Sequence, residues 1–254
     1  AQYRQIIFHS GPRQVGKTTT SLEASAESPV HYYFNWDNDD HRALILEGPQ
    51  AVAFVAELET LRKTLPILVF DEIHKYRYWK RFLKGFFDTY EKKCKIIVTC
   101  SARLDVYKRG GDSLMGRYFL YHLHPLTIRE IIDPRLPTQE IQKPKEISFA
   151  NYHALLDFGG FPEPYLRRKK VFFNHWKRLR MEQLFREDLR DLSQVQEIGQ
   201  MQLLAEILTE EATHSLNHSM LASKIKVSAP TLSRWMTILK NLYFCFSIQP
   251  FSKN

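Results

Sequence analysis

Eight consecutive residues near the start of the chain have the types and spacing of a phosphate-binding loop. Residues 11–18, GPRQVGKT, match G-x-x-x-x-G-K-[S/T] at every fixed position, after an apolar strand-like run and before helix-forming residues. The inward N–H groups of such a loop and the positive helix N-terminus suit a polyphosphate. Lys17 would reach the β- and γ-phosphates, and the Thr18 hydroxyl would coordinate Mg²⁺. Against a turn that binds nothing, we predict a nucleotide site made by Gly11, Pro12, Arg13, Gln14, Val15, Gly16, Lys17, Thr18 and Thr19.

An acidic pair follows a second apolar run, in PILVFDEIHKY, residues 66–76. Asp71 would lie at the carboxyl end of a buried strand and hold the same Mg²⁺. Glu72 would orient or deprotonate a water for attack on the γ-phosphate, although such a pair can also simply cap the following helix. Because a water-activating carboxylate suits hydrolysis, we favour hydrolysis over phosphoryl transfer to a metabolite, with Glu72 and Lys17 as catalytic residues.

Hydroxyl groups end a third strand-like run, IIVTCSARLD, residues 96–105. Thr99 and Ser101 would lie between the phosphate loop and the acidic strand, where they could touch the γ-phosphate or the attacking water. Ordinary turn chemistry of Ser and Thr is an equally good interpretation. Both residues are therefore candidate sensors of the nucleotide.

The elements that must position these residues alternate along the first 128 residues, strand then helix. This alternation predicts an α/β fold with a mostly parallel sheet covered on both faces. Runs of Ile, Val and Phe on consecutive positions, as in ILVF, suit strands that are buried on both sides. The expected helices include residues 18–26, 50–63 and 79–90. The expected strands are residues 5–9, 31–34, 67–70, 95–99 and 117–123.

The second half of the chain reads as helical, after a proline-rich junction in DPRLPTQEIQKPK. Near its end, two amphipathic helices, a turn in VSAP and a third helix, TLSRWMTILKN, precede LYFCFSIQPF, which we expect to form a strand or wing. This order predicts a winged helix-turn-helix. The predicted domains are a P-loop core at 1–128, a helical lid or linker at 129–200 and the winged helix at 201–254.

The charge of the chain favours an acidic partner without identifying it, because the net charge is +8 and the pI is near 9.3. Residues 167–180, RRKKVFFNHWKRLR, fit a solvated basic helix face and a nucleic-acid contact equally well. In the winged helix, Arg234 would enter a DNA groove while Lys224 and Lys226 contact phosphates. Trp235 at helical spacing fits core packing, so a lid or a dock for a protein is the alternative.

Taken in order, SGPRQVGKTT, VFDEIHKYRYWKRFLKGFFD, VTCSARLDVYKRGGDSLMGRYFLYHLHPLTIREI and GGFPEP resemble the prokaryotic AAA+-type ATPases whose C-terminal half is a domain of unknown function. The resemblance covers nearly the whole chain and implies an AAA+-like ATPase core with the roles given above. It also implies an arginine finger in SLMGRY, with Arg117 preferred and Arg103 and Arg109 as alternatives. An ordinary ion pair at a strand edge is the competing interpretation of Arg117.

The chain also departs from this family pattern. Members usually have glycine where Cys100 stands, and they usually continue beyond the winged helix, so we expect the chain to be a fragment. No apolar run approaches the ~18 residues of a membrane span, and no signal peptide opens the chain, so a cytoplasmic location is expected. An acidic stretch is expected to be a solvated strand exit and not a metal site: Asp37, Asp39, Asp40 and His41.

Together these features predict a Mg²⁺-dependent ATPase that converts ATP to ADP and acts as a DNA-associated or regulatory switch. Its expected partners are ATP, and either duplex DNA or a protein docked on the winged helix, with a homo-oligomer as a further option. A nucleotide-gated binding protein with little turnover is the alternative from another class. A small-molecule kinase would need an acceptor pocket, for which the sequence offers no motif.

Overall fold

The computed structural model describes residues 4–101, 114–135, 139, 141, 143–189, 197–249 and 251. The chain divides into two compact units, Ala1–Phe173 and Asn174–Asn254. The predicted division into three domains stays a prediction.

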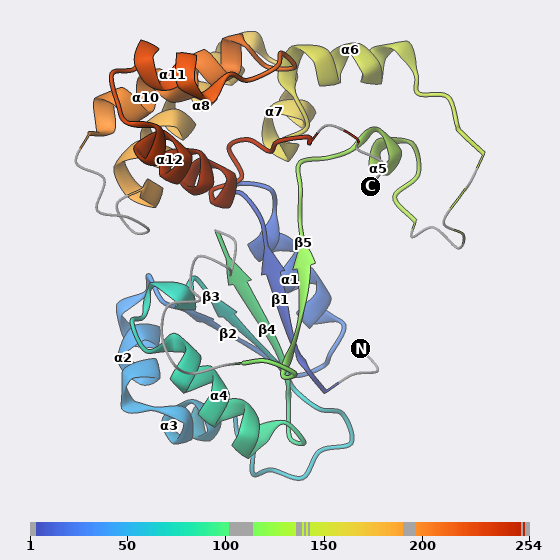
Figure 1. Ribbon diagram of the computed structural model, residues 1–254. Helices are drawn as coiled ribbons and strands as arrows, with labels where there is room; N and C mark the ends of the chain where they lie inside the picture. Colours follow the sequence, from blue (N-terminus) through green and yellow to red (C-terminus); the bar gives the residue numbers. More distant parts are fainter. Residues whose placement is uncertain are drawn as a thin grey trace. The chain divides into compact units, whose positions relative to one another are not determined.

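The first unit contains a five-stranded parallel sheet whose order along the sheet is β2-β3-β4-β1-β5 (Figure 1). This arrangement confirms the expected α/β fold class. Each predicted strand is correct to within one residue at either end. The strands are β1 (Ile6–Ser10), β2 (His31–Asn35), β3 (Ile67–Asp71), β4 (Lys95–Cys100) and β5 (Tyr118–His122).

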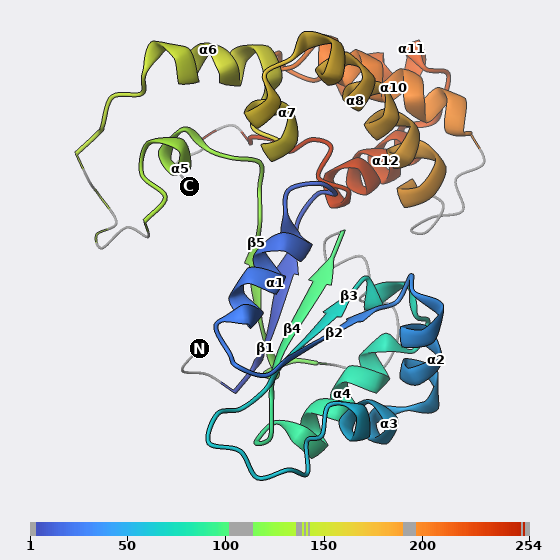
Figure 2. The ribbon, with the colours of Figure 1, turned by 180° about the vertical axis from the view of Figure 1, so that it is seen from behind.

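Helices cover both faces of this sheet (Figures 1 and 2). Helix α1 (Lys17–Ala26) lies on one face, and α2 (Asp39–Glu47), α3 (Pro49–Val55) and α4 (Trp79–Tyr90) lie on the other. Successive side chains of a strand point to opposite faces, so the strands divide their residues between the two layers. The even-numbered apolar residues of β1, β2 and β3 enter an aromatic core with α4.

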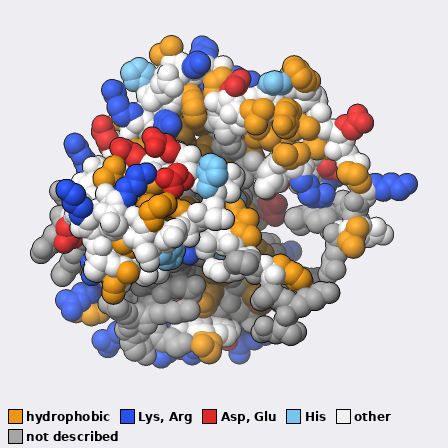
Figure 3. Space-filling view, turned by 45° about the horizontal axis from the view of Figure 1, so that its top comes forward, with side chains coloured by type: hydrophobic (Ala, Val, Ile, Leu, Met, Phe, Trp, Pro, Cys, Tyr) orange, Lys and Arg blue, Asp and Glu red, His pale blue; other side chains and the backbone are white. Residues whose placement is uncertain are grey.

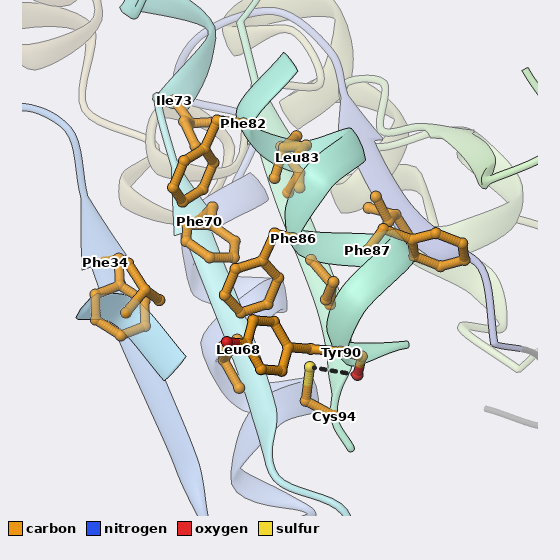
Figure 4. Packing of buried hydrophobic residues seen from close by; sticks show 14 of the residues in the cluster. Phe34, Leu68, Phe70, Ile73, Phe82, Leu83, Phe86, Phe87, Tyr90 and Cys94 are labelled. Atoms are coloured by element: carbon orange, nitrogen blue, oxygen red, sulfur yellow. Dashed lines mark hydrogen bonds between the residues drawn. The ribbon is translucent and has the colours of Figure 1, made fainter. Parts of the chain in front are cut away.

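Phe70 of β3 lies at the centre of that core (Figure 4). Its ring stacks on Phe34 at a centroid distance of 5.4 Å and meets Phe82 at 5.8 Å and Phe86 at 5.6 Å, both edge to face. Phe82, Phe86 and Tyr90 recur every four residues, so one stripe of α4 faces the sheet. Aromatic packing on this side therefore anchors the strands that carry the site.

Two elements on this side differ from the sequence expectation. The acidic stretch after β2 is helical and not a simple strand exit, because the Asn38 side chain caps α2 by accepting from the His41 N–H at 3.0 Å. Asp39 and Asp40 then lie in the first helical turn, where negative charge is favourable. The helix expected at 50–63 ends at Val55, because Glu57 turns the backbone with a left-handed φ of 49°.

After β5, the first unit continues with α5 (Ile128–Ile132), α6 (Phe149–Phe158) and α7 (Pro162–Arg167). The Leu126 N–H donates to the Gly160 carbonyl at 2.6 Å. A Cβ on Gly160 would lie 2.4 Å from the Leu126 carbonyl oxygen, so only glycine allows this approach. The turn between α6 and α7 is thereby joined to the chain that leaves β5.

Helix α8 (Lys170–Gln183) crosses the boundary between the units, and a π-helical segment (Leu184–Asp188) follows it. The second unit then has α10 (Ile198–Glu210), α11 (His218–Lys224) and α12 (Ala229–Asn241). Ser228, in the expected VSAP turn, caps α12 by accepting from the Thr231 N–H at 3.2 Å. The strand expected after α12 is absent from residues 242–249 and 251, where Tyr243 turns the backbone with a φ of 58°. The C-terminal unit is therefore helical in its described part, without the expected wing.

No helix within the described ranges is both long enough and apolar enough to cross a membrane.

Candidate nucleotide-binding site

The glycine loop joins the carboxyl end of β1 to the first turn of α1. Gln14 and Gly16 have positive φ angles of 65° and 93°, and α1 has no side-chain cap at its N-terminus. Its first N–H groups are therefore available to an anion. A Cβ on Gly11 would lie 2.1 Å from the Leu123 carbonyl oxygen, so glycine is required there by the chain after β5.

Lys17 points back into this loop. Its ammonium donates to the Gly11 carbonyl at 3.0 Å and to the Pro12 carbonyl at 2.8 Å, and the residue is buried. Burial lowers the pKa of Lys17, and the negative charge of Glu72 opposes that shift. The structure thus holds a buried cation at the loop where the sequence predicts phosphate binding.

Asp71, at the carboxyl end of β3, gathers three hydroxyl groups. Thr18 and Tyr33 donate to its Oδ2 atom at 2.9 and 2.6 Å, and Thr99 donates to its Oδ1 atom. Tyr33, Asp71 and Thr99 are odd-numbered residues of adjacent strands, so they share the sheet face that α1 covers. The Thr18 hydroxyl and the Asp71 carboxylate are hard oxygen donors of the kind that Mg²⁺ prefers.

Glu72 adopts a left-handed conformation, with a φ of 55°. A non-glycine residue in this region is strained, and such strain is concentrated at functional sites. Its Oε2 atom lies 3.5 Å from the Lys75 ammonium and 3.7 Å from His74 Nε2, and it accepts no hydrogen bond from the described residues. Burial raises the pKa of Glu72. The carboxylate is therefore more basic than an exposed glutamate, and the cation beside it among the described residues is Lys75 at 3.5 Å.

The two candidate sensors have different surroundings. Thr99 contacts the Asp71 carboxylate, whereas the Ser101 hydroxyl lies 3.3 Å from Nε2 of the buried His74. Burial lowers the pKa of His74 to about 3, so the ring is neutral at pH 7. Ser101 is thereby connected to the region of Glu72, and Thr99 to the carboxylate expected to hold the metal.

Arg117 lies far from this cluster within one chain. Its carbonyl accepts from the Ile6 N–H at the amino end of β1, whereas the glycine loop follows the carboxyl end of the same strand. Its guanidinium is paired with Asp88 of α4, with distances of 2.7 Å from Nε and 3.2 Å from Nη2. The structure thus contains the ion pair, and an arginine-finger role for Arg117 stays a prediction. Arg103 and Arg109 lie outside the described residues.

The residues predicted to contact DNA lie in the second unit. Lys224 pairs with Glu211 at 3.2 Å, Arg234 is exposed, and Lys226 is exposed with a left-handed φ of 57°. Trp235 is fully buried, as core packing requires. On the face drawn in Figure 3, the Lys and Arg side chains of the described residues lie scattered among acidic and apolar ones.

Sequence reasoning missed two side chains of the candidate site, Tyr33 and His74. Tyr33 lies on β2, which is distant from the acidic pair in sequence and becomes its neighbour only through the strand order. Once β2 is known to pair with β3, the strand alternation places Tyr33 on the same face of the sheet as Asp71, and that would have been the signal. His74 stands two residues after Glu72, but no pattern showed that its ring turns inward.

Comparison with known families agrees with this geometry. The family described as "AAA domain" matches residues 3–132, which is more than half of the chain, and the family "Domain of unknown function (DUF8612)" matches residues 150–254. The chain therefore belongs to the AAA domain family, followed by that second domain. Its first half is an AAA-type P-loop core, and this class implies nucleotide binding.

Similar solved structures include that of Drosophila ORC bound to DNA, with 11% identity and a TM-score of 0.36, covering 96% of this chain and 64% of that one. They also include C. elegans PCH-2, with 12% identity and a TM-score of 0.36, covering 95% and 61%. The chain thus spans less than two thirds of the length of either neighbour. Among curated proteins, none matches the chain.

Proposed function

We propose that the chain binds ATP with Mg²⁺ at residues 11–18 and hydrolyses it to ADP, with Glu72 orienting the attacking water. The observation that carries this proposal is the hydrogen bond between Thr18 and Asp71, which joins the two predicted metal ligands at the carboxyl edge of the sheet. The loop, the buried Lys17 and the strained Glu72 lie around that edge.

Each of these residues has a distinct task in the reaction. Lys17 exchanges its two loop carbonyls for phosphate oxygens, and the free N–H groups of α1 bind the same anion. Glu72 accepts a proton from water, for which a buried carboxylate with a raised pKa is better suited than an exposed one. When bound, Mg²⁺ would be held by Thr18 and Asp71 and would neutralise charge on the phosphates.

The test replaces Glu72 with Gln, which keeps the shape and removes the base. We expect kcat for ATP hydrolysis to fall by about 10²-fold or more while the affinity for a fluorescent ATP analogue is retained. Glu23→Gln, on the exposed side of α1, is the matched control and should change neither quantity. Full turnover in Glu72→Gln would contradict the role assigned to Glu72. Transfer of the γ-phosphoryl group of ATP to a metabolite, with no release of inorganic phosphate, would indicate a kinase.

A second candidate is a nucleotide switch that turns over slowly as an isolated chain. The position of Arg117, paired with Asp88 at the amino end of the sheet, favours it. In this proposal an arginine comes from a neighbouring copy or another partner. Mixing the Arg117→Ala chain, which keeps Glu72, with the Glu72→Gln chain, which keeps Arg117, should restore hydrolysis if copies share a site. A mixture no more active than its components would contradict sharing.

For the second unit, the proposed role is contact with duplex DNA or with a docking protein. The net charge of +8 and the exposed Arg234 and Lys226 support an acidic partner. Duplex DNA should then raise the hydrolysis rate at low salt, and Arg234→Ala should reduce that stimulation. Equal stimulation at low and moderate salt, or none at all, would argue against DNA and leave a protein partner.

A further inference from the structure

The Asp71 carboxylate has more hydrogen-bond donors than the phosphate loop supplies. Thr18 of α1 accounts for one contact at Oδ2, and Thr99 of β4 contacts Oδ1. The remaining donor is the phenol of Tyr33 on β2, which lies 2.6 Å from Oδ2. This is the shorter of the two contacts to that atom.

The sheet geometry explains how Tyr33 reaches this position. In the β2–β3 register, Asn35 pairs with Asp71 and Tyr33 pairs with Val69, one pleat earlier on the same face. The side chain of Tyr33 is long enough to extend along the face to the end of the neighbouring strand. Tyr32, the adjacent residue, packs instead against the aromatic core on the opposite face.

The three donors fix the carboxylate from three secondary-structure elements. A carboxylate that binds a metal is normally held by such outer hydrogen bonds, and their loss typically costs 10- to 100-fold in metal affinity. Among the described residues, Thr99 contacts Oδ1, whereas Tyr33 and Thr18 donate to Oδ2, and Thr18 is itself an expected metal ligand. Tyr33 is thus the contact that orients Oδ2 independently of the ligand set.

We propose that Tyr33 is a positioning residue for the Mg²⁺ of this site, acting through Asp71 Oδ2. This inference rests on the proposed nucleotide-binding function and deepens it. Tyr33 itself does not touch the nucleotide or the metal, so its contribution is to the affinity for Mg²⁺ and not to the chemistry of water attack.

The test is the Mg²⁺ dependence of binding of a fluorescent ADP analogue to Tyr33→Phe, which lacks only the hydroxyl. We expect the Mg²⁺ concentration for half-maximal enhancement to rise about tenfold, with unchanged affinity in EDTA and an unchanged thermal midpoint. In the ATPase assay, saturating Mg²⁺ should restore kcat. Tyr32→Phe makes the same change on the other face of the strand and should behave as wild type.

The possible outcomes distinguish the role of Tyr33 from the proposed Mg²⁺-dependent nucleotide binding. Wild-type binding that depends on Mg²⁺, together with an identical or tighter Mg²⁺ dependence in Tyr33→Phe, would overturn the role of Tyr33 alone. Loss of analogue affinity in EDTA as well would also overturn it, because it would indicate a general structural role. A wild-type chain whose nucleotide binding ignores Mg²⁺ would overturn both proposals.

Discussion

The two faces of the parallel sheet carry different kinds of side chains. On one face, Phe34 and Phe70 pack with α4 in an aromatic core. On the other, the alternate residues Tyr33, Asp71 and Thr99 form a hydrogen-bonded cluster beneath α1. Because a strand alternates its side chains strictly, a single stretch such as ILVFD supplies both a core and a site. Substitutions on the two faces should therefore be separable into losses of stability and losses of ligand affinity.

The largest effect is expected from the aromatic face. Phe86 is fully buried against Phe70, so Phe86→Ala should lower the free energy of unfolding by about 3–5 kcal/mol. This is a large part of the stability of an ordinary domain. Urea unfolding followed by tryptophan fluorescence measures it. A loss below about 1 kcal/mol would mean that α4 does not anchor the sheet.

Lys17→Met tests the opposite face. Removing charge-assisted hydrogen bonds to phosphate should weaken ATP-analogue binding by about 10- to 100-fold. Stability without nucleotide should change little, because burial already disfavours the charged form of Lys17. Isothermal titration calorimetry measures the affinity for the ATP analogue, and thermal unfolding measures the stability without nucleotide. Lys92→Met, at an exposed position, is the control. If Lys17→Met strongly destabilised the fold but kept its affinity for the ATP analogue, Lys17 would serve stability and not ligand binding, contrary to the comparison of the two faces.

His74 adds a pH dependence to the stability of this region. The folded-state pKa of His74 is about 3, below the ordinary value of 6.5. As the pH falls below 6.5, His74 therefore becomes protonated in the unfolded chain but stays neutral in the folded chain. Stability is therefore lost with falling pH, by about 2 kcal/mol between pH 7 and 5 for one such group. His74→Gln should lack this component, and the exposed His153→Gln should keep it. Parallel pH profiles for the wild type and His74→Gln would disprove the assignment.

The smallest effect on stability is expected at the amino end of the sheet. Arg117 and Asp88 form a largely solvent-exposed ion pair, and such pairs contribute little. Arg117→Ala should leave the thermal midpoint nearly unchanged. Any loss of hydrolysis in this variant then reports a contribution in trans, because the fold is intact. A marked drop in the midpoint would show that the ion pair holds α4 to the sheet.

Much of the core and the phosphate loop could be predicted from sequence because both depend on local patterns. The apolar runs fixed the five strands, and GPRQVGKT with the acidic pair after ILVF indicated the nucleotide edge. Tyr33 could not be found because its contact to Asp71 depends on β2 lying beside β3. The sequence predicts a strand exit at Asp39 and Asp40, where α2 in fact begins, because Asn and Asp favour turns as readily as helix starts.

The fate of LYFCFSIQPF and the surroundings of Arg117 could not be predicted for a similar reason. LYFCFSIQPF has the composition of a strand, but residues 242–249 have no strand partner within the described part of the chain, so β-propensity alone did not decide the outcome. Arg117 was placed correctly next to β5, but sequence could not show which end of the sheet it would occupy or that Asp88 would pair with it. Both depend on contacts between distant residues.

The most direct test of the central claim is a Mg²⁺ titration of ADP-analogue binding to Asp71→Asn, beside wild type and the exposed Asp157→Asn. The account predicts that Asp71→Asn binds the analogue only as well in Mg²⁺ as in EDTA, while the other two chains gain affinity from the metal. Full metal enhancement in Asp71→Asn would show that the hydroxyl-bonded carboxylate beneath α1 is not the metal ligand, and would contradict the account.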